Sequence, residues 1–249
     1  MTIIELESVP STNTWAKEHA EELHHADIVL TNDQTAGRGQ RGNSWEAEPG
    51  MNLTFSLCLE PSSILPSEQF LLSEVVALGV ADAVAQAPGL GTQQEEITVK
   101  WPNDIYAGNR KIAGILIEHS IRGNRIAKSI AGIGLNVNQR IFRSDAPNPV
   151  SMHQLTGRNH SLPQVLEKVV GEILNRLISL ESIAGKESLH SAYLSRMWRN
   201  DGALHTFATP DGTRFQAMIT GVEPTGMLSL TTDAGEQRTF AFKEVAFIL

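Results

Sequence analysis

The segment Gly37-Arg38-Gly39-Gln40-Arg41-Gly42 lies between two stretches that have the composition of β-strands. The β-branched run at residues 28–31 precedes it, and residues 52–59 follow it. Its three glycines let the backbone approach phosphate oxygens, and its guanidiniums are charged at any physiological pH. Glycine loops anchored between strands are typical of ligand sites, so we expect an anion-binding loop. The alternative is a flexible surface turn.

The surrounding region is predicted to form a mixed sheet flanked by helices. Short apolar runs separated by the turns Gly108-Asn109 and Gly123-Asn124 predict hairpin-linked strands between residues 97 and 136. Four helices are predicted from capping residues and apolar periodicity. The first covers residues 15–23, directly after the capping cluster at residues 11–14, and the second starts at Ser67. The third starts at Ser161 with a capping box to Gln164, and the fourth covers about residues 187–199. The fold class is α+β.

The end of the chain has the pattern of a small all-β domain. After Asn200-Asp201-Gly202, apolar and polar residues alternate, as in Phe215/Ala217/Ile219. Turn triplets separate these runs at the spacing of small barrels: Pro210-Asp211-Gly212, Pro224-Thr225-Gly226 and Asp233-Ala234-Gly235. We therefore expect a larger domain at residues 1–199 and a small β-barrel at residues 200–249.

The composition limits the class of protein. With 249 residues, 41% of them apolar, the chain can fill a globular core. A net charge of −8 without a long basic stripe argues against nucleic acid as the main partner. No signal peptide or membrane-spanning stretch is found, so we expect a cytoplasmic protein without a membrane partner. The single cysteine, Cys58, alternates with leucines and is interpreted as a packed thiol.

The motif Trp101-Pro102-Asn103-Asp104 places polar residues in a strand-rich region. Because Pro102 cannot donate to a sheet ladder, a turn or bulge at a ligand pocket is expected. An Asx-turn is the alternative explanation of Asn103. The indole of Trp101 is expected to form a pocket wall over an adenine or a hydrocarbon chain.

Lys111 directly precedes an apolar strand, residues 112–117, which would hold its ammonium beside the glycine loop. There it can neutralise charge on an α-phosphate, whereas the alternative is a solubilising lysine at a strand end. Gly114, Gly132 and Gly134 indicate close approach of a ligand to two strands, or of a neighbouring helix. Asn136 would then be able to bind a phosphate or a ribose.

Taken together in their order along the chain, the motifs resemble those of biotin protein ligases, also called biotin–acetyl-CoA-carboxylase ligases. The resemblance extends over most of the first two hundred residues. It rests on Ser11-Thr12-Asn13, Gln34 with the glycine loop, and residues 100–104, 111–114 and 132–136. It implies a class II synthetase-like mixed sheet followed by a Src-homology-3-like barrel, in agreement with the pattern of strands and helices.

The resemblance also implies a reaction for residues 1–199. Biotin and MgATP form biotinyl-5′-adenylate with loss of pyrophosphate, and a lysine of a biotin carboxyl carrier protein then accepts the biotin. The implied ligands are therefore ATP, Mg²⁺ and biotin, and no covalent enzyme intermediate is required. Asp104 is the candidate for contact with magnesium, whose ligand set is not predicted. A monomer and a homodimer both remain open.

By this resemblance, Arg38 and Lys111 are the catalytic residues, which steady developing negative charge. The residues implied for biotin are Ser11, Thr12, Asn13, Gln34, Arg38, Gly39, Gln40, Lys111 and Gly114. Those implied for ATP and the adenylate are Gly37, Arg38, Gly39, Gln40, Arg41, Gly42, Trp45, Trp101, Asn103, Asp104, Lys111 and Asn136.

The sequence departs from the family pattern in the glycine loop and at the N-terminus. Family loops commonly carry arginine at the position of Gln40, so we expect weaker retention of the adenylate. Some members carry an N-terminal helix-turn-helix domain, but the ligase motif here begins by Ser11, and we expect no DNA binding. Residues 139–149 lie where relatives have an adenylate-binding loop and are expected to order with ligand. An ordinary exposed connection is the alternative.

Three other functions are considered. A lipoate or octanoate transferase resembles this fold but is not expected to have the arginine-containing glycine loop followed by Trp45. A biotin-responsive binding protein or corepressor would bind without turnover. An inactive interaction module would not need Arg38 and Lys111 together.

Overall fold

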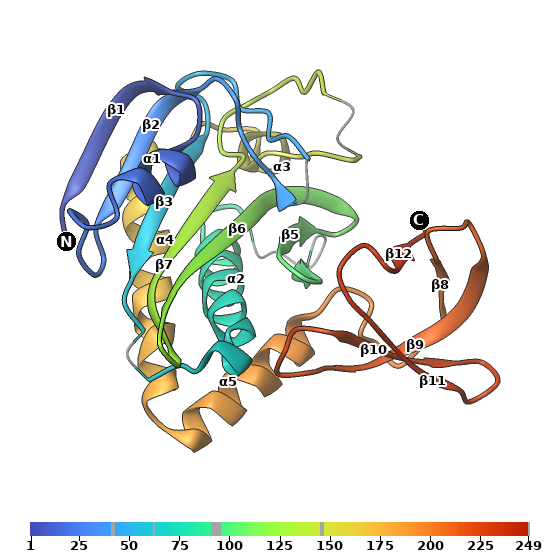
Figure 1. The fold of residues 1–249 in the computed structure, drawn as a ribbon. Helices are drawn as coiled ribbons and strands as arrows, with labels where there is room; N and C mark the ends of the chain where they lie inside the picture. Colours follow the sequence, from blue (N-terminus) through green and yellow to red (C-terminus); the bar gives the residue numbers. More distant parts are fainter. Residues whose placement is uncertain (41–42, 62, 91–95, 145–146, 249) are drawn as a thin grey trace.

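The computed structural model describes residues 1–40, 43–61, 63–90, 96–144 and 147–248. Its centre is a seven-stranded sheet in the order β1-β2-β3-β7-β6-β5-β4 (Figure 1). The strands are β1 (Ile3–Val9), β2 (Ile28–Gln34), β3 (Leu53–Leu59), β4 (Ile97–Lys100), β5 (Asp104–Ala107), β6 (Arg110–Arg122) and β7 (Arg125–Leu135). β1 and β2 are parallel, and the other neighbours are antiparallel. The predicted mixed sheet is confirmed.

Both predicted hairpins are present. β5 turns into β6 at Gly108, and β6 turns into β7 at Gly123. These glycines have φ angles of 56° and 61°, in the left-handed region where a residue without a side chain is unstrained. The turns therefore fix the register of the three strands that later supply most of the site.

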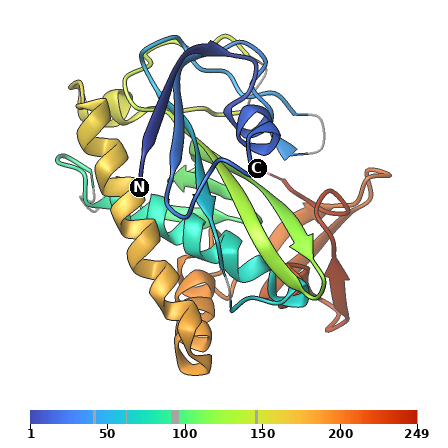
Figure 2. The same ribbon diagram turned by 60° about the vertical axis from the view of Figure 1, so that its left-hand side comes forward.

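Helices cover the two faces of the sheet unequally. The helices α2 (Phe70–Ala85), α4 (Leu162–Leu177) and α5 (Ile183–Arg196) lie on one side, and the short α1 (Thr12–Glu18) lies on the other (Figure 2). Because strand residues alternate in direction, Leu57 and Leu59 join the core beneath α2 and α4, whereas Cys58 packs on the α1 side. None of the described helices is long and apolar enough to cross a bilayer.

Several predicted helix boundaries are wrong. α1 ends at Glu18 rather than near Leu23, and α5 begins at Ile183, where Ser182 caps it, rather than at Glu187. Ser161 precedes α4 without a side-chain capping bond, since Pro163 removes one of the N–H groups that a cap uses. A capping box forms instead at Ser151 and Gln154. The remaining short helices are η2 (Pro66–Glu68), α3 (Met152–Thr156) and η3 (Ile178–Glu181).

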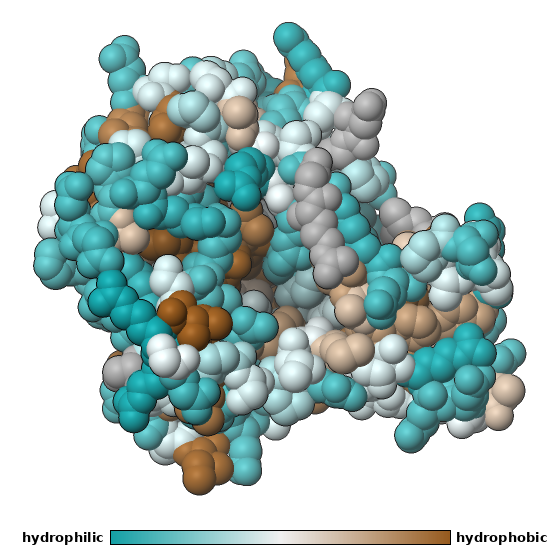
Figure 3. All heavy atoms as spheres, in the orientation of Figure 1, coloured by the Kyte–Doolittle hydropathy of each residue, from teal (hydrophilic) through white to brown (hydrophobic). Residues whose placement is uncertain are grey.

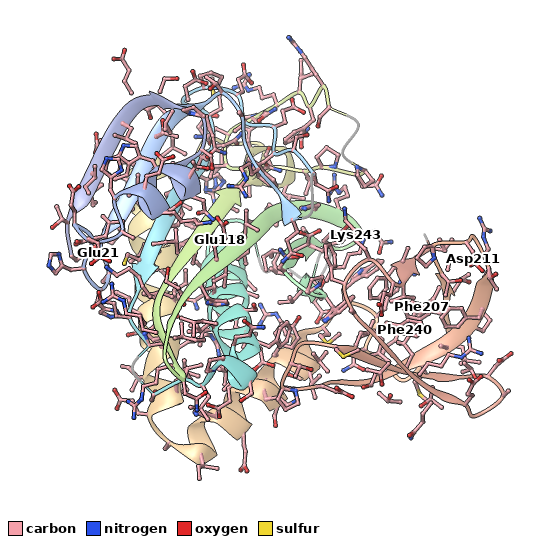
Figure 4. The ribbon with its side chains drawn as sticks, viewed as in Figure 1. Glu21, Glu118, Phe207, Asp211, Phe240 and Lys243 are labelled. Atoms are coloured by element: carbon pink, nitrogen blue, oxygen red, sulfur yellow. The ribbon has the colours of Figure 1, made fainter. Side chains whose placement is uncertain are left out.

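A second, antiparallel sheet in the order β11-β10-β9-β8-β12 closes the chain. Its strands are β8 (His205–Ala208), β9 (Arg214–Val222), β10 (Leu228–Thr232), β11 (Gln237–Phe240) and β12 (Ala246–Phe247). It agrees with the predicted small Src-homology-3-like barrel, and its turns contain Gly212, Gly226 and Gly235 at positive φ. β8 was not predicted, and Phe242, for which the alternation of Phe240 and Phe242 predicts a strand, lies outside the strands. Phe207 and Phe240 lie within this sheet (Figure 4).

Candidate active site

A cavity opens on the α1 side of the sheet, beside the N-terminus of α1. Figure 3 shows this face of the molecule hollowed near its centre, between the main sheet and the C-terminal sheet. The described residues that line the cavity come from α1, the glycine loop and five strands of the main sheet, β2, β3, β5, β6 and β7, together with Phe242. Those with predicted roles are Ser11, Thr12, Asn13, Gln34, Arg38, Gly39, Gln40, Trp45, Asn103, Asp104, Lys111 and Gly114.

Polar side chains form the floor of the cavity. Gln34 Oε1 accepts a hydrogen bond from the backbone N–H of Thr12 at 3.0 Å. The Ser56 hydroxyl lies 2.9 Å from Thr12 Oγ1 and 2.6 Å from Asn13 Oδ1, and Asn13 Nδ2 donates to the Leu116 carbonyl at 3.0 Å. Ser11 caps α1, and Ser11, Thr12 and Asn13 are all buried. Thus the residues predicted from the N-cap motif sit at the base of the cavity.

Glu118 extends this network to the rim, and sequence reasoning missed it. Its carboxylate accepts from Asn13 Nδ2 at 3.1 Å and from Lys17 Nζ at 2.8 Å, and it lies 3.7 Å from Arg38 Nη2. Figure 4 shows it on β6 beneath α1. The signal was present in the alternation of β6, because Gly114, Leu116 and Glu118 share one face.

Hydrogen bonds keep Glu118 ionised. Burial acts to raise the pKa of its carboxyl group, but the hydrogen bonds from Lys17 and Asn13 and the charges of Lys17 and Arg38 lower this pKa below its usual value. The site thus has a fixed negative charge beside its arginine. This charge orients the Arg38 side chain, whose Nη1 also donates to Thr14 Oγ1 at 3.1 Å.

The glycine loop forms a narrow hairpin over the cavity. Arg38 and Ser44 form an antiparallel bridge, Gly39 N donates to Asn43 O at 2.7 Å, and Trp45 N donates to Gly37 O at 3.0 Å. A side chain at Gly37 would collide with the backbone of Trp45 and the Gln34 amide, so glycine is required for the close approach. Arg41 and Gly42 lie outside the described residues.

Side chains from α1 and from the glycine loop pack against the glycines of β6 and β7. A Cβ on Gly132 would overlap the Asn13 amide, and one on Gly134 would overlap the Trp45 indole, which also covers Gly114. The Trp45 Nε1 is buried without a hydrogen-bond partner among the described residues. The alternative of a neighbouring helix therefore applies to Gly132, which α1 approaches, whereas the loop residue Trp45 lies over the other two. Close approach of a ligand to these strands stays a prediction.

Lys111 and Asp104 mark the boundary between this cavity and a second one. Lys111 Nζ lies 2.7 Å from Asp104 Oδ1, and 5.7 Å from the centroid of the Trp45 ring. The second cavity has a volume of about 620 Å³ and is lined by Trp45, Asp104 and Lys111 as well as by Lys100, Tyr106, Asn136 and residues of the 139–149 segment. Lys111 therefore faces both spaces.

Three predicted ligand residues have structural partners. Trp101 is not among the described residues that line either cavity: its Nε1 donates to Gly226 O at 2.9 Å and its ring lies 6.2 Å from that of Phe242. The side chain predicted to form a pocket wall therefore contacts residues that connect the strands of the C-terminal sheet. Asn103 lines the first cavity, but its amide bonds the Ile115 carbonyl. Asn136 donates to Val150 O at 3.1 Å, and its Oδ1 is buried without a partner in the described part of the chain.

Cys58 is a buried thiol that does not line the cavity. It is buried among apolar residues on the α1 side of the sheet. This burial raises the pKa of its thiol to about 11, so the thiolate is scarce at neutral pH. The predicted packed thiol is confirmed.

The sequence matches known proteins over this whole architecture. Residues 5–136 match the biotin/lipoate A/B protein ligase family. A biotin–[acetyl-CoA-carboxylase] ligase of Paracoccus denitrificans is 30% identical over 232 residues, which are 91% of this chain and 93% of that protein. The chain belongs to the biotin/lipoate A/B protein ligase family. Within it, the bifunctional ligase/repressor BirA of Salmonella typhimurium is 30% identical over 77% of this chain but only 56% of its own length.

Solved structures of family members agree with the fold. A biotin protein ligase from Aquifex aeolicus, solved in complex with biotin and ATP, superposes with a TM-score of 0.79 at 26% identity. The superposition covers 98% of this chain and 97% of that one, so both sheets belong to the shared family architecture.

Proposed function

We propose that this chain is an ATP-dependent biotin protein ligase, which activates biotin as biotinyl-5′-AMP and transfers it to a lysine of a biotin carboxyl carrier protein. The observation that supports this most directly is the junction of two cavities at Lys111 and Asp104. A ligase that joins a carboxylic acid to ATP needs two adjacent subsites with a cation at their junction. The family relatives supply the identity of the acid.

The first cavity has the chemistry that a cyclic urea requires. Its floor presents hydroxyl and amide groups of the buried Ser11, Thr12 and Asn13 and of the half-buried Gln34, and hydrogen bonds hold them in fixed orientations. Buried donors and acceptors reward a ligand that pairs with them and reject one that leaves them unpaired. The Trp45 indole supplies an apolar wall for the hydrocarbon tail. We therefore place the ureido group at the floor and the carboxylate beneath Lys111.

The first chemical step needs positioning and charge. The biotin carboxylate oxygen attacks the α-phosphorus of ATP, the bond from that phosphorus to the bridging oxygen breaks, and pyrophosphate departs with the electron pair. Lys111 stabilises the negative charge on the α-phosphate, and Asp104 holds its ammonium in place. Arg38 would help to retain the adenylate. In the second step, the acceptor amine attacks the carbonyl carbon, AMP leaves, and the amine loses one proton.

Magnesium fits the second cavity as a partner of the nucleotide. Among the described residues no group of three His, Cys, Asp or Glu side chains could hold a metal ion alone. Mg²⁺ in nucleotide enzymes is instead held by one or two carboxylates together with phosphates. We propose that it enters with ATP and that Asp104, which lines the second cavity, is its protein ligand. Bound there, it would neutralise phosphate charge.

The test measures the acyl group transferred. The protein is incubated with ATP, Mg²⁺, an apo biotin carboxyl carrier domain and equal concentrations of biotin, lipoate and octanoate, and the carrier is analysed by intact mass spectrometry. We expect one biotinyl group on one lysine. Lipoyl or octanoyl transfer without biotinyl transfer would assign the chain to the other branch of its family, and ATP-dependent biotin binding without transfer would leave a binding protein.

A further inference from the structure

Four polar side chains share one corner of the main sheet. The register of the strands pairs Lys100 with Asp104 and Tyr106 with Lys111, and residues directly opposite in an antiparallel pair project to the same face. All four line the second cavity. Lys111 is already assigned to the boundary with the first cavity. Lys100, the last residue of β4, has no role in the site as described so far.

Aromatic rings surround the ammonium of Lys100. Its Nζ donates to Tyr106 Oη at 3.0 Å and lies 4.9 Å from the centroid of that ring. It also lies 5.4 Å from the ring of Trp198, which follows α5, and 5.7 Å from that of Phe247 in β12. These distances permit cation–π attraction, which fixes a cation in place without neutralising its charge. Part of this aromatic box comes from the C-terminal sheet.

Lys100 differs from Lys111 and Arg38 in having no salt-bridge partner among the described residues. Lys111 is paired with Asp104 at 2.7 Å, and Arg38 lies 3.7 Å from Glu118. In the described part of the chain, no carboxylate lies within salt-bridge distance of Lys100 Nζ. Burial lowers the pKa of Lys100, although the charge of Asp104 opposes this effect. A partly buried ammonium of this kind gains stability when an anion enters the cavity beside it.

We propose that Lys100 binds the phosphate chain of ATP beyond the α-phosphate and therefore holds the pyrophosphate as it leaves. This assignment rests on the proposed ligase function. Lys111 lies at the junction with the first cavity, where the α-phosphate must meet the carboxylate, whereas Lys100 lines only the second cavity. Each cation thus serves a different part of the same nucleotide.

A purely structural role makes a different prediction. If Lys100 only joined β4 to Trp198 and Phe247, its removal would lower stability and disturb every activity alike. A phosphate-binding lysine affects ATP and pyrophosphate but not the second half-reaction, in which the adenylate carries no pyrophosphate. The two roles are therefore separated by comparing phosphate binding with transfer from supplied biotinyl-5′-AMP.

The experiment compares four variants with the wild type. Lys100→Met keeps an unbranched apolar stem, Lys100→Gln keeps a donor for Tyr106, and Lys100→Arg keeps the charge. Lys168→Met is the matched control, because Lys168 lies on α4, outside both cavities, where it pairs with Glu172 at 2.7 Å. Binding of ATP and of inorganic pyrophosphate is measured by titration calorimetry, and biotinyl transfer to a carrier domain is measured from supplied biotinyl-5′-AMP.

We expect Lys100→Met and Lys100→Gln to weaken binding of ATP and pyrophosphate roughly tenfold to a hundredfold, as for loss of a charge-assisted bond. Lys100→Arg should retain most of the affinity, Lys168→Met should match the wild type, and transfer from supplied adenylate should stay within about twofold in all variants. Unchanged phosphate binding in the neutral variants, or an equal loss of transfer from the adenylate, would overturn the assignment.

The test of phosphate binding by Lys100 can be distinguished from the test of the proposed ligase function. A wild-type protein that binds ATP and pyrophosphate but never adenylates biotin would disprove the ligase function, and the binding data would still decide the role of Lys100. A wild-type protein that binds neither phosphate compound would overturn both proposals. If Lys100→Met fails to fold, the Gln and Arg variants provide the same comparison of neutral and charged side chains.

Discussion

The Lys111 ammonium and the Asp104 carboxylate lie 2.7 Å apart at the boundary between the two cavities, each with 26% of its side chain exposed. The lysine is therefore held by a partner from the neighbouring strand instead of moving freely at a strand end. It remains accessible from both sides, which a lysine sealed in a buried ion pair would not be. A cation with this position can meet a carboxylate from one cavity and a phosphate from the other.

We expect Gly132→Ala to weaken biotin binding by more than about tenfold, because a Cβ there overlaps the Asn13 amide and would displace it from Ser56 and Leu116. The control is Gly171→Ala in α4, where nothing lies within 4 Å and alanine should stabilise the helix by about 0.5–1 kcal/mol. Calorimetric biotin affinity and denaturant unfolding measure the two effects. Normal affinity in Gly132→Ala would show that Asn13 does not contact biotin.

Glu118→Gln tests the charge that orients Asn13, Lys17 and Arg38. The amide keeps the size of the side chain but removes its negative charge, so we expect a loss of roughly threefold to tenfold in biotin affinity. The KM for ATP should remain within about twofold, since Glu118 does not line the second cavity. Glu21→Gln, an exposed residue paired with Arg122, is the control. An equal effect in both variants would argue against a positioning role for Glu118.

The hairpin-linked strands of the main sheet were predictable, because their signals are local, whereas β1 was not predicted. Alternation and the turn glycines at 108 and 123 determine β5, β6 and β7 from residues that are close in sequence. The partners of the site residues are not local. Asn13 meets Glu118 across 105 residues, and alternation can place Glu118 on a face without telling which helix covers that face.

The contacts of Trp101 were also not predictable from the sequence. Its size and its place in the same motif as Asn103 were compatible with a pocket wall, but its indole contacts Gly226 and Phe242, which lie between strands of the C-terminal sheet. The position of the second sheet relative to the first depends on packing between distant segments, and no periodicity encodes it. The same packing brings Phe247 to Lys100, which explains why the aromatic box was not predicted.

Gln40→Arg is expected to slow release of biotinyl-5′-AMP, because arginine restores a positive charge beside the phosphate that family loops commonly have. Gln40 lines the first cavity, and its carbonyl accepts from Asn43 N at 3.3 Å, so the substitution leaves this backbone contact intact. Release is followed by trapping the free adenylate with hydroxylamine in the absence of carrier protein. A release rate as fast as that of the wild type would disprove the hypothesis.

His119 predicts a pH dependence of stability. Burial lowers the pKa of its imidazole in the folded protein below the value of 6.5, while Nδ1 lies 2.8 Å from Ser129 Oγ. The unfolded chain therefore binds more protons as the pH falls below 6.5, and the free energy of unfolding decreases. We expect His119→Gln to reduce this acid slope, with His160, whose pKa is also lowered by burial, retaining part of it. If the free energy of unfolding, measured by denaturant at a series of pH values, falls equally steeply with pH in the wild type and in His119→Gln, the prediction is contradicted.

The central claim is that the chain adenylates the carboxylate of biotin and that Lys111 stabilises the reacting α-phosphate. The most direct measurement is biotin-dependent release of pyrophosphate from ATP and Mg²⁺ in a single turnover, in the wild type and in Lys111→Met, with Lys168→Met as the control. We predict release in the wild type and in the control, and a loss of roughly a hundredfold or more in Lys111→Met, as for removal of a charge-stabilising group. Pyrophosphate release that does not depend on biotin, or that survives unchanged in Lys111→Met, would contradict the proposed function.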